Sequence, residues 1–306
     1  DGDFAAQTAQ LKDLQLTGPD GLRVSGHLNL EQLLDAPQYS GQLTAAPFNL
    51  RPWIARTGAS LDTASEAALS DVALTSPIEG SLERVALPRL SLVVDDSTFT
   101  GDVSAALDGN QLSFTLEGDA LNLDHYLPGA ATAQQASRGL LRKAFAQSEE
   151  ALLPQEWLRT LTLQGDLSVE QLVLAGLTFS NTQLALRGEN GSHRLTSFES
   201  DFYEGELNAT GQLDATGNVL EWQLSPNVRN VQVAPLIETF SEEEAPLRGR
   251  FNLEGALTTQ GNRRDVLVSN LNGELDARLN DGAILRSNVS REMCELAAEL
   301  EGRAAD

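Results

Sequence analysis

Apolar and polar residues alternate along much of this chain. Side chains at positions i and i+2 share one face of a β-strand, so each run predicts a strand with one apolar and one polar face. The clearest runs cover residues 14–16, 90–94, 112–116, 161–163, 220–224 and 251–253. So many short strands predict a mainly β fold.

Turn-forming residues separate these runs. Glycine with Asp, Asn or Thr occurs at residues 19–21, 108–110, 189–191, 216–218 and 281–282. Asp-Gly and Asn-Gly pairs supply the positive φ angles that tight hairpins need. The pattern therefore predicts repeated antiparallel β-meanders.

Two segments interrupt the alternation with helical spacing. Residues 132–150 contain no proline and few β-branched residues, and Pro154 ends this helical region, with a further turn at 156–158. Residues 290–303 place Met293, Leu296 and Leu300 on one face. Such helices either cover the end of a sheet or bind a partner.

A short pattern recurs three times, at residues 48–54, 121–127 and, more loosely, 230–237. Each copy has a strand, an Asn, an apolar residue, a polar step and an apolar or aromatic pair. Repetition favours an elongated, curved sheet over a closed barrel. The predicted organisation is a β-repeat part at 1–127, a helical insertion at 128–160, a second β-repeat part at 161–284 and a helical tail at 285–306.

Composition narrows the classes of partner. The 306 residues include 44 Asp and Glu but only 21 Lys and Arg, which gives a formal net charge of −23 and a pI near 4.4. Binding to nucleic acid is therefore disfavoured, and so is binding to anionic lipid through a polybasic segment. One cysteine, Cys294, excludes an internal disulfide and a cysteine-based zinc site. No apolar run is long enough to span a bilayer.

The sequence lacks the motifs of common catalytic sites. It contains no nucleophile elbow, phosphate-binding Gly-rich loop or His-Glu-x-x-His motif. Asp95 and Asp96 are expected to point to opposite faces of a strand, residues 242–244 to form a solvated loop, and His125 to lie in a turn. We therefore expect no enzyme activity, no catalytic residue, no metal site and no cofactor.

The apolar faces of the strands need a partner surface, and three arrangements supply one. They can form a closed sandwich core, pack against a second domain, or line an open trough that holds a hydrophobic ligand. Aromatic residues make up only 5% of the chain, which argues against sugar-stacking grooves. Aliphatic side chains suit acyl chains and an ordinary core equally well, so the residues alone leave both open.

Five stretches resemble the AsmA-like family of Gram-negative bacteria. They are residues 90–101, 165–177, 202–207, 228–237 and 271–283. Each is built of ordinary strand and turn residues, and their order along the chain carries the match, which extends from about Leu11 to Ala283.

This resemblance implies a bridge-like lipid-transfer protein. The chain would be the periplasmic part of a longer protein, anchored in the inner membrane by an N-terminal helix outside this sequence. Its β half-pipe would shield phospholipid acyl chains between inner and outer membranes. Its partners would be those acyl chains and membrane components that bind regions outside this chain. The alternatives are a scaffold for assembling outer-membrane proteins and an extracellular β-repeat that binds polysaccharide.

If the half-pipe exists, one parity of each strand lines its groove. The expected lining residues are Leu90, Leu92, Val94, Phe99, Val103, Leu112, Phe114, Leu116, Leu207, Leu213, Trp222, Leu224, Phe251 and Leu253.

Overall fold

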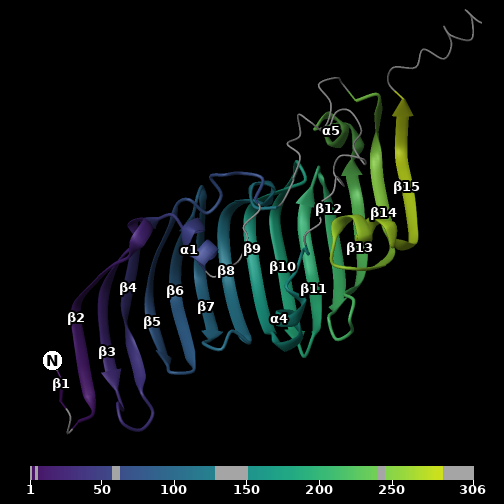
Figure 1. Cartoon of the computed structure of the whole chain (residues 1–306). Helices are drawn as coiled ribbons and strands as arrows, with labels where there is room; N and C mark the ends of the chain where they lie inside the picture. The colour runs from purple at the N-terminus through teal and green to yellow at the C-terminus, as the bar shows by residue number, and fades with distance from the viewer. Residues whose placement is uncertain (1, 4–5, 57–62, 128–150, 240–244, 285–306) are drawn as a thin grey trace, which may run out of the picture.

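The computed structural model describes residues 2–3, 6–56, 63–127, 151–239 and 245–284. Its strands form one fifteen-stranded sheet, in which each strand lies beside its neighbours in sequence (Figure 1). The first and last strands do not meet, so the sheet stays open. The prediction of a mainly β, elongated and curved antiparallel sheet is confirmed.

Most strands are nine to fourteen residues long, which gives the sheet its height. Their bounds are β1 (Gly2–Asp3), β2 (Thr8–Thr17), β3 (Arg23–Glu31), β4 (Gln38–Phe48), β5 (Val72–Ser81), β6 (Arg84–Val94), β7 (Ser97–Ala106), β8 (Gln111–Asn122), β9 (Thr162–Leu174), β10 (Leu177–Glu189), β11 (Ser192–Phe202), β12 (Gly205–Asp214), β13 (Glu221–Gln232), β14 (Leu247–Gln260) and β15 (Asn272–Ile284).

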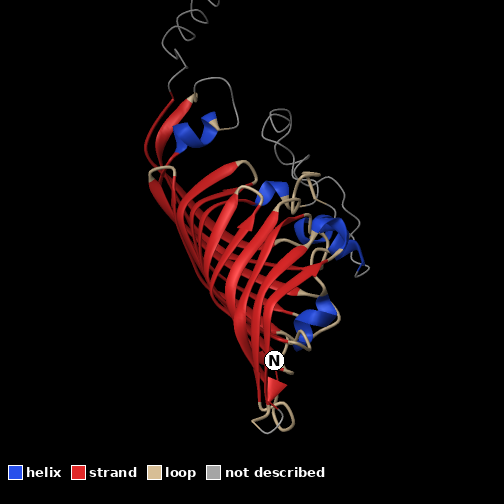
Figure 2. Ribbon diagram, turned by 90° about the vertical axis from the view of Figure 1, so that its left-hand side faces the viewer, coloured by secondary structure: helices blue, strands red, loops and turns tan. Residues whose placement is uncertain are grey.

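Short helices follow or precede strands at the two long rims of the sheet. They are η1 (Pro19–Gly21), α1 (Arg51–Arg56), η2 (Leu123–His125), α4 (Gln155–Thr160), α5 (Val233–Glu238) and α6 (Arg264–Ser269). We call the rim where β4, β8 and β13 end the upper rim; it carries α1, η2 and α5. The lower rim, where β9 begins and β14 ends, carries α4 and α6. Figure 2 shows the helices on one side of the sheet.

Every neighbouring pair of strands is antiparallel except β8 and β9, which are parallel. Parallel neighbours need a crossover, so the chain leaves β8 at the upper rim and enters β9 at the lower rim through α4. The helical turn expected at 156–158 is present within α4. The helices expected at 132–150 and 290–303, the loop at 242–244 and Cys294 lie outside the described residues.

Bulges keep the apolar side chains on one face where the two-residue period fails. In β6, Leu87 pairs with Val103 and Leu90 pairs with Gly101, so consecutive inward positions are three residues apart. Arg89 takes up the extra residue with a φ of 50°. A bulge of this kind bends its strand and increases the twist of the sheet. Similar register shifts fall between 11 and 14, 195 and 198, and 228 and 231.

The turn predictions hold at four places and are wrong at one. Residues 108–110 and 189–191 lie at hairpin turns, and 19–21 and 216–218 lie in the connections after β2 and β12. Asp281 and Gly282 lie inside β15, where Asp281 has a φ of 52° and the pairing with β14 shifts register. A left-handed residue followed by glycine serves a strand bulge as well as a hairpin, and the sequence does not distinguish the two.

The recurring pattern has a local cause in its first two copies. The Asn49 Oδ1 accepts the Arg51 backbone N–H at 3.0 Å, and the Asn122 Oδ1 accepts that of Asp124 at 3.1 Å. Each Asn ends a strand and starts a short helix at the upper rim. The third copy differs, because Asn230 sits in a β13 bulge with a φ of 54° and α5 begins three residues later.

Asp95 lies in the β6–β7 turn with a φ of 52°, so the expectation that it sits on a strand beside Asp96 is wrong. Its carboxylate accepts the backbone N–H groups of residues 69–71 at 2.7–3.2 Å and the Tyr126 hydroxyl at 2.8 Å. Burial raises the pKa of Asp95, but these hydrogen bonds outweigh it and hold the pKa below its ordinary value of 3.8. Asp95 thus joins three segments of the upper rim.

Replacing Asp95 with Asn should destabilise the protein by about 1–3 kcal/mol, because the three backbone N–H groups and the Tyr126 hydroxyl lose a charged acceptor. Since the folded-state pKa is depressed, the stabilisation is present above about pH 4 and is lost as the pH falls through the folded-state value. Urea unfolding at pH 7 and near pH 3 should show a smaller difference at the lower pH. Asp96→Asn, at the exposed neighbour, is the control; equal losses for both variants would contradict this account.

Candidate functional site

The cross-strand register assembles one continuous apolar face. Paired residues in neighbouring strands share a face, so a row can be followed from strand to strand. One such row across the N-terminal half is Leu16, Val24, Ala45, Leu74, Leu92, Phe99 and Gly118. A row in the C-terminal half is Leu207, Val228, Leu253 and Ala277.

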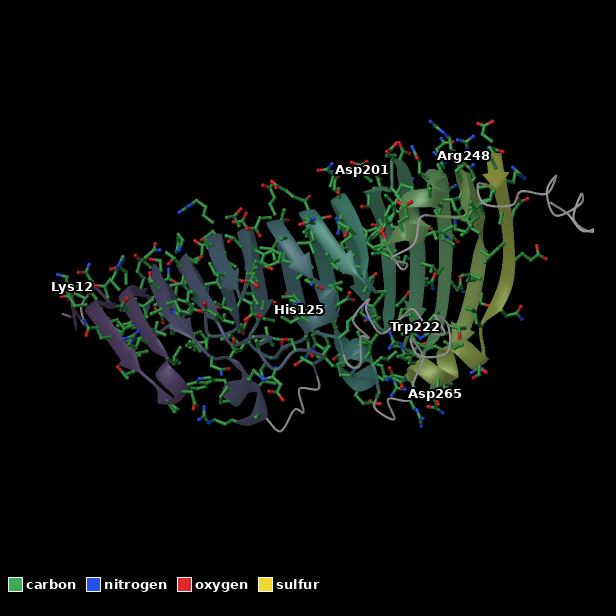
Figure 3. All side chains as sticks on the ribbon, turned by 90° about the horizontal axis from the view of Figure 1, so that it is seen from above. Lys12, His125, Asp201, Trp222, Arg248 and Asp265 are labelled. Atoms are coloured by element: carbon green, nitrogen blue, oxygen red, sulfur yellow. The ribbon has the colours of Figure 1, made fainter. Side chains whose placement is uncertain are left out.

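The fourteen residues expected to line a groove all lie on this face. The pairings that place them include Leu90 with Gly101, Leu92 with Phe99, Val94 with Ser97, Val103 with Phe114, Leu112 with Leu163, Leu116 with Leu167, Leu207 with Val228, Leu213 with Trp222, Leu224 with Leu257, Phe251 with Leu279 and Leu253 with Ala277. Figure 3 shows Trp222 on the side of the sheet where Asp265 lies, away from the outline marked by Asp201 and Arg248. That these side chains contact lipid remains a prediction.

No second sheet packs against the apolar face in the described part of the chain, although Leu90 and Phe99 of the expected lining are buried, at 3% and 8% exposed. Leu224, in the middle of the C-terminal half, is 41% exposed. At the two ends of the sheet, Leu16 and Leu279 are 56% and 40% exposed. A closed sandwich core would bury all three, so the arrangement is a trough rather than a core.

At the lower rim, residues 151–160 form a strap along the C-terminal half. The first residues of the strap are bonded to Asn262, which lies just after β14. The Asn262 backbone carbonyl accepts the Leu152 N–H at 2.8 Å, and the Asn262 side chain exchanges two hydrogen bonds with Leu153 at 2.9 and 2.7 Å. The strap ends in α4, where the Trp157 Nε1–H donates to the Gly109 carbonyl at 2.8 Å. The strap therefore crosses from β14 to β8.

Apolar packing holds the strap against the sheet. Leu158 of α4 is buried with Leu161, Ala215 and Leu220, and this cluster contacts Trp222 and other apolar residues of the trough floor. At the opposite rim, α5 adds Leu236 to a second cluster around Phe179, Phe202 and Val231. The C-terminal half of the trough thus has a wall at each rim.

Aromatic rings on the floor lie close over glycines of the neighbouring strand. A Cβ at Gly165 would lie 2.3 Å from Phe114, and one at Gly118 would lie 2.6 Å from Phe99. The same arrangement pairs Tyr39 with Gly80 and His193 with Gly188. Because glycine has no side chain, each ring covers its partner strand instead of standing up into the trough.

His193 was not identified from the sequence as a site residue, yet it anchors the strap. It is 7% exposed, and its Nε2 lies 2.8 Å from the Leu158 carbonyl oxygen, which requires that nitrogen to carry the proton. Its Nδ1 has no hydrogen-bond partner and faces Gly188. The only sequence signal is the parity that His193 shares with Leu195, which predicts an inward position but not a contact with α4.

Within the described residues, no group of three or more His, Cys, Asp or Glu side chains is arranged to hold a metal ion. His125 lies in η2, exposed, with its Nε2 3.2 Å from the Asn122 Nδ2. Among the described helices, none has both the length and the apolar character needed to cross a membrane.

Comparison with known proteins gives one match. The sequence model of the AsmA family matches residues 39–306. No curated protein and no solved structure matches the chain significantly.

Gly165→Ala should destabilise the protein by about 1–3 kcal/mol, because the new methyl group would collide with the Phe114 ring and force it off the floor. Glycine-to-alanine changes within strands otherwise tend to stabilise a protein. A loss of stability in Gly165→Ala would therefore indicate the collision with the ring. Gly217→Ala is the control, since a Cβ there would meet no atom closer than 3.6 Å. Urea unfolding curves decide it: a Gly165→Ala variant as stable as the wild type would show that the ring does not need this glycine.

Proposed function

The chain belongs to the AsmA family, and on that premise we propose that its trough shields the acyl chains of phospholipids as they pass between two membranes. Membership of the family fits a role in lipid transport or membrane assembly in general. The finer proposal is that this chain works in the bacterial periplasm, tethered to the inner membrane, and serves outer-membrane lipid homeostasis.

The observation that carries the proposal is the length of the predominantly apolar face, in which Thr182 and Ser200 are among the few polar inward residues. It runs from Leu16 on β2 to Leu279 on β15, near the two ends of the sheet. With strands about 4.8 Å apart, fifteen strands extend roughly 65 Å. One leaflet of a bilayer core is only about 15 Å thick. A surface several times longer than an acyl chain suits passage along it better than storage of one ligand.

The distribution of polar groups supports the same proposal. Residues that alternate with the apolar row, such as Thr115 and Gln223, are exposed on the other face. The net charge of −23 would weaken adhesion of the outer surface to anionic headgroups. Exposed apolar patches of this extent mark surfaces that bind apolar partners. A lipid lying in the trough would keep its headgroup in water at the open side.

Site-specific photo-crosslinking tests the proposal. A photoreactive residue at Phe114 or Leu224 should crosslink co-purified or added phospholipid, and one at Thr115 or Gln223 should not, because neighbouring residues of a strand face opposite sides. Mass spectrometry of the crosslinked protein identifies the lipid. Absence of lipid at all four positions would favour the alternative role as a scaffold for outer-membrane proteins. Its binding strand would be β15, whose outer edge pairs with no strand among the described residues.

A charge on the floor should reduce lipid binding without unfolding the sheet. Leu224→Asp should lower phospholipid occupancy about tenfold, because a carboxylate next to an acyl chain is costly to desolvate. Leu224 is exposed enough to accept the change. Gln223→Asp, one residue away on the outer face, is the matched control. Native mass spectrometry of folded protein measures the occupancy; equal occupancy in both variants would contradict the assignment of Leu224 to the lining.

A further inference from the structure

The strap encloses a separate pocket at the lower rim of the C-terminal half. The pocket has a volume of about 570 Å³ and lies on the floor between α4 and α6. Its principal walls are Leu158, Leu163, Leu213, Trp222, Leu257 and Leu267. That volume falls within the range of roughly 300–1,000 Å³ typical of small-molecule sites.

Two polar side chains on the pocket walls already have acceptors, and Arg194, Gln212, Gln223 and Thr258 alternate with the inward residues and so point to the other face. The Trp222 Nε1–H donates to the Gly261 carbonyl at 2.9 Å, and the Thr259 hydroxyl donates to that of Leu267 at 2.6 Å. The nearby Arg187 points to the other face, where it makes two hydrogen bonds to Asp166 at 2.9 and 3.0 Å. The Nδ1 of His193 has no partner, but it is an acceptor because Nε2 carries the proton. Among the described side chains that face the pocket, a phosphate would therefore find no free donor, and an aliphatic segment matches it best.

The strap also decides which way such a segment can lie. Its start is bonded to Asn262 and its end to Gly109, so it borders the lower rim of the pocket between β14 and β8. The pocket opens toward the middle of the trough, where Leu195 and Leu224 lie on its floor. An aliphatic segment that enters the pocket from the trough therefore has its leading end next to the strap.

We propose that this pocket binds the methyl end of one lipid acyl chain, with the headgroup directed away from the strap toward the open trough. The proposal rests on the proposed function, and it adds an orientation and a retention site to it. In the C-terminal half, a lipid then moves along the trough or leaves on the side away from the strap, and it does not leave past α4.

Trp222 provides a reporter inside the pocket. In a Trp53→Phe, Trp157→Phe variant, Trp222 is the one tryptophan left in the sequence. The strap loses its bond to Gly109 in this variant but keeps its bonds to Asn262 and the packing of Leu158. The fluorescence of Trp222 should be quenched several-fold more strongly by stearic acid carrying a nitroxide on the sixteenth carbon than by stearic acid carrying it on the fifth. The matched reporter keeps Trp157 and replaces Trp53 and Trp222; Trp157 is 41% exposed on the strap and should show no such preference.

Two variants on α6 separate the pocket from general binding. Leu267→Glu places a carboxylate in the pocket wall and should abolish the preference for the sixteenth-carbon nitroxide. Val268→Glu changes the adjacent exposed residue and should leave it intact. Equal quenching by the two nitroxides in the Trp222 reporter, or stronger quenching by the fifth-carbon probe, would overturn the proposal.

The outcomes also separate this proposal from the proposed function. Lipid crosslinking at Phe114 without quenching of Trp222 would keep the trough as a lipid conduit and refute the pocket. No crosslinking and no quenching would refute both. A photoreactive residue at Leu257 that crosslinks to residues 128–150 instead of to lipid would show that the chain fills its own pocket, which also refutes the proposal.

Discussion

The hydrogen-bonded register between neighbouring strands is the constraint on which the trough depends. A slip of one residue would send the apolar side chains of a strand to the polar face. The bulges matter for the same reason, because strands longer than the alternating runs would otherwise drift out of phase. At Arg89 and Asn230, one residue with positive φ restores the phase and bends the strand. Curvature and a continuous apolar face thus have a common origin.

An open apolar face is costly, since each Å² left in water forgoes about 25 cal/mol of burial free energy. The structure limits this cost at the rims, where α4 and α5 bury Leu158 and Leu236 in two clusters. Between the rims no second sheet covers the described part of the face, and the rings of Phe99 and Phe114 lie over glycines of the next strand. The floor is therefore largely apolar, as the proposed path for acyl chains requires.

Polar side chains in this protein act mainly as connectors. Asp95 gathers backbone donors from the segment before β5, and Asp124 accepts the N–H groups of Ala175 and Gly176 in the β9–β10 turn at 2.6 and 2.7 Å. Asn262 fastens the strap across more than a hundred residues of sequence. Each bond satisfies backbone groups that an open sheet leaves at its rims. Of the carboxylates that stand side by side in the sequence, Asp95 is used in this way.

The sequence by itself determined the strand content, the antiparallel meanders and the parity of the lining residues within each run, because alternation and turn chemistry are local. Only the tertiary structure decided that this face is a trough and not a closed core, since that depends on whether a second layer covers Leu224. It alone revealed the parallel β8–β9 pair, the bulge at Asp281 and the place of His193 beneath α4. These features follow from register and from contacts between distant segments, which no local pattern records.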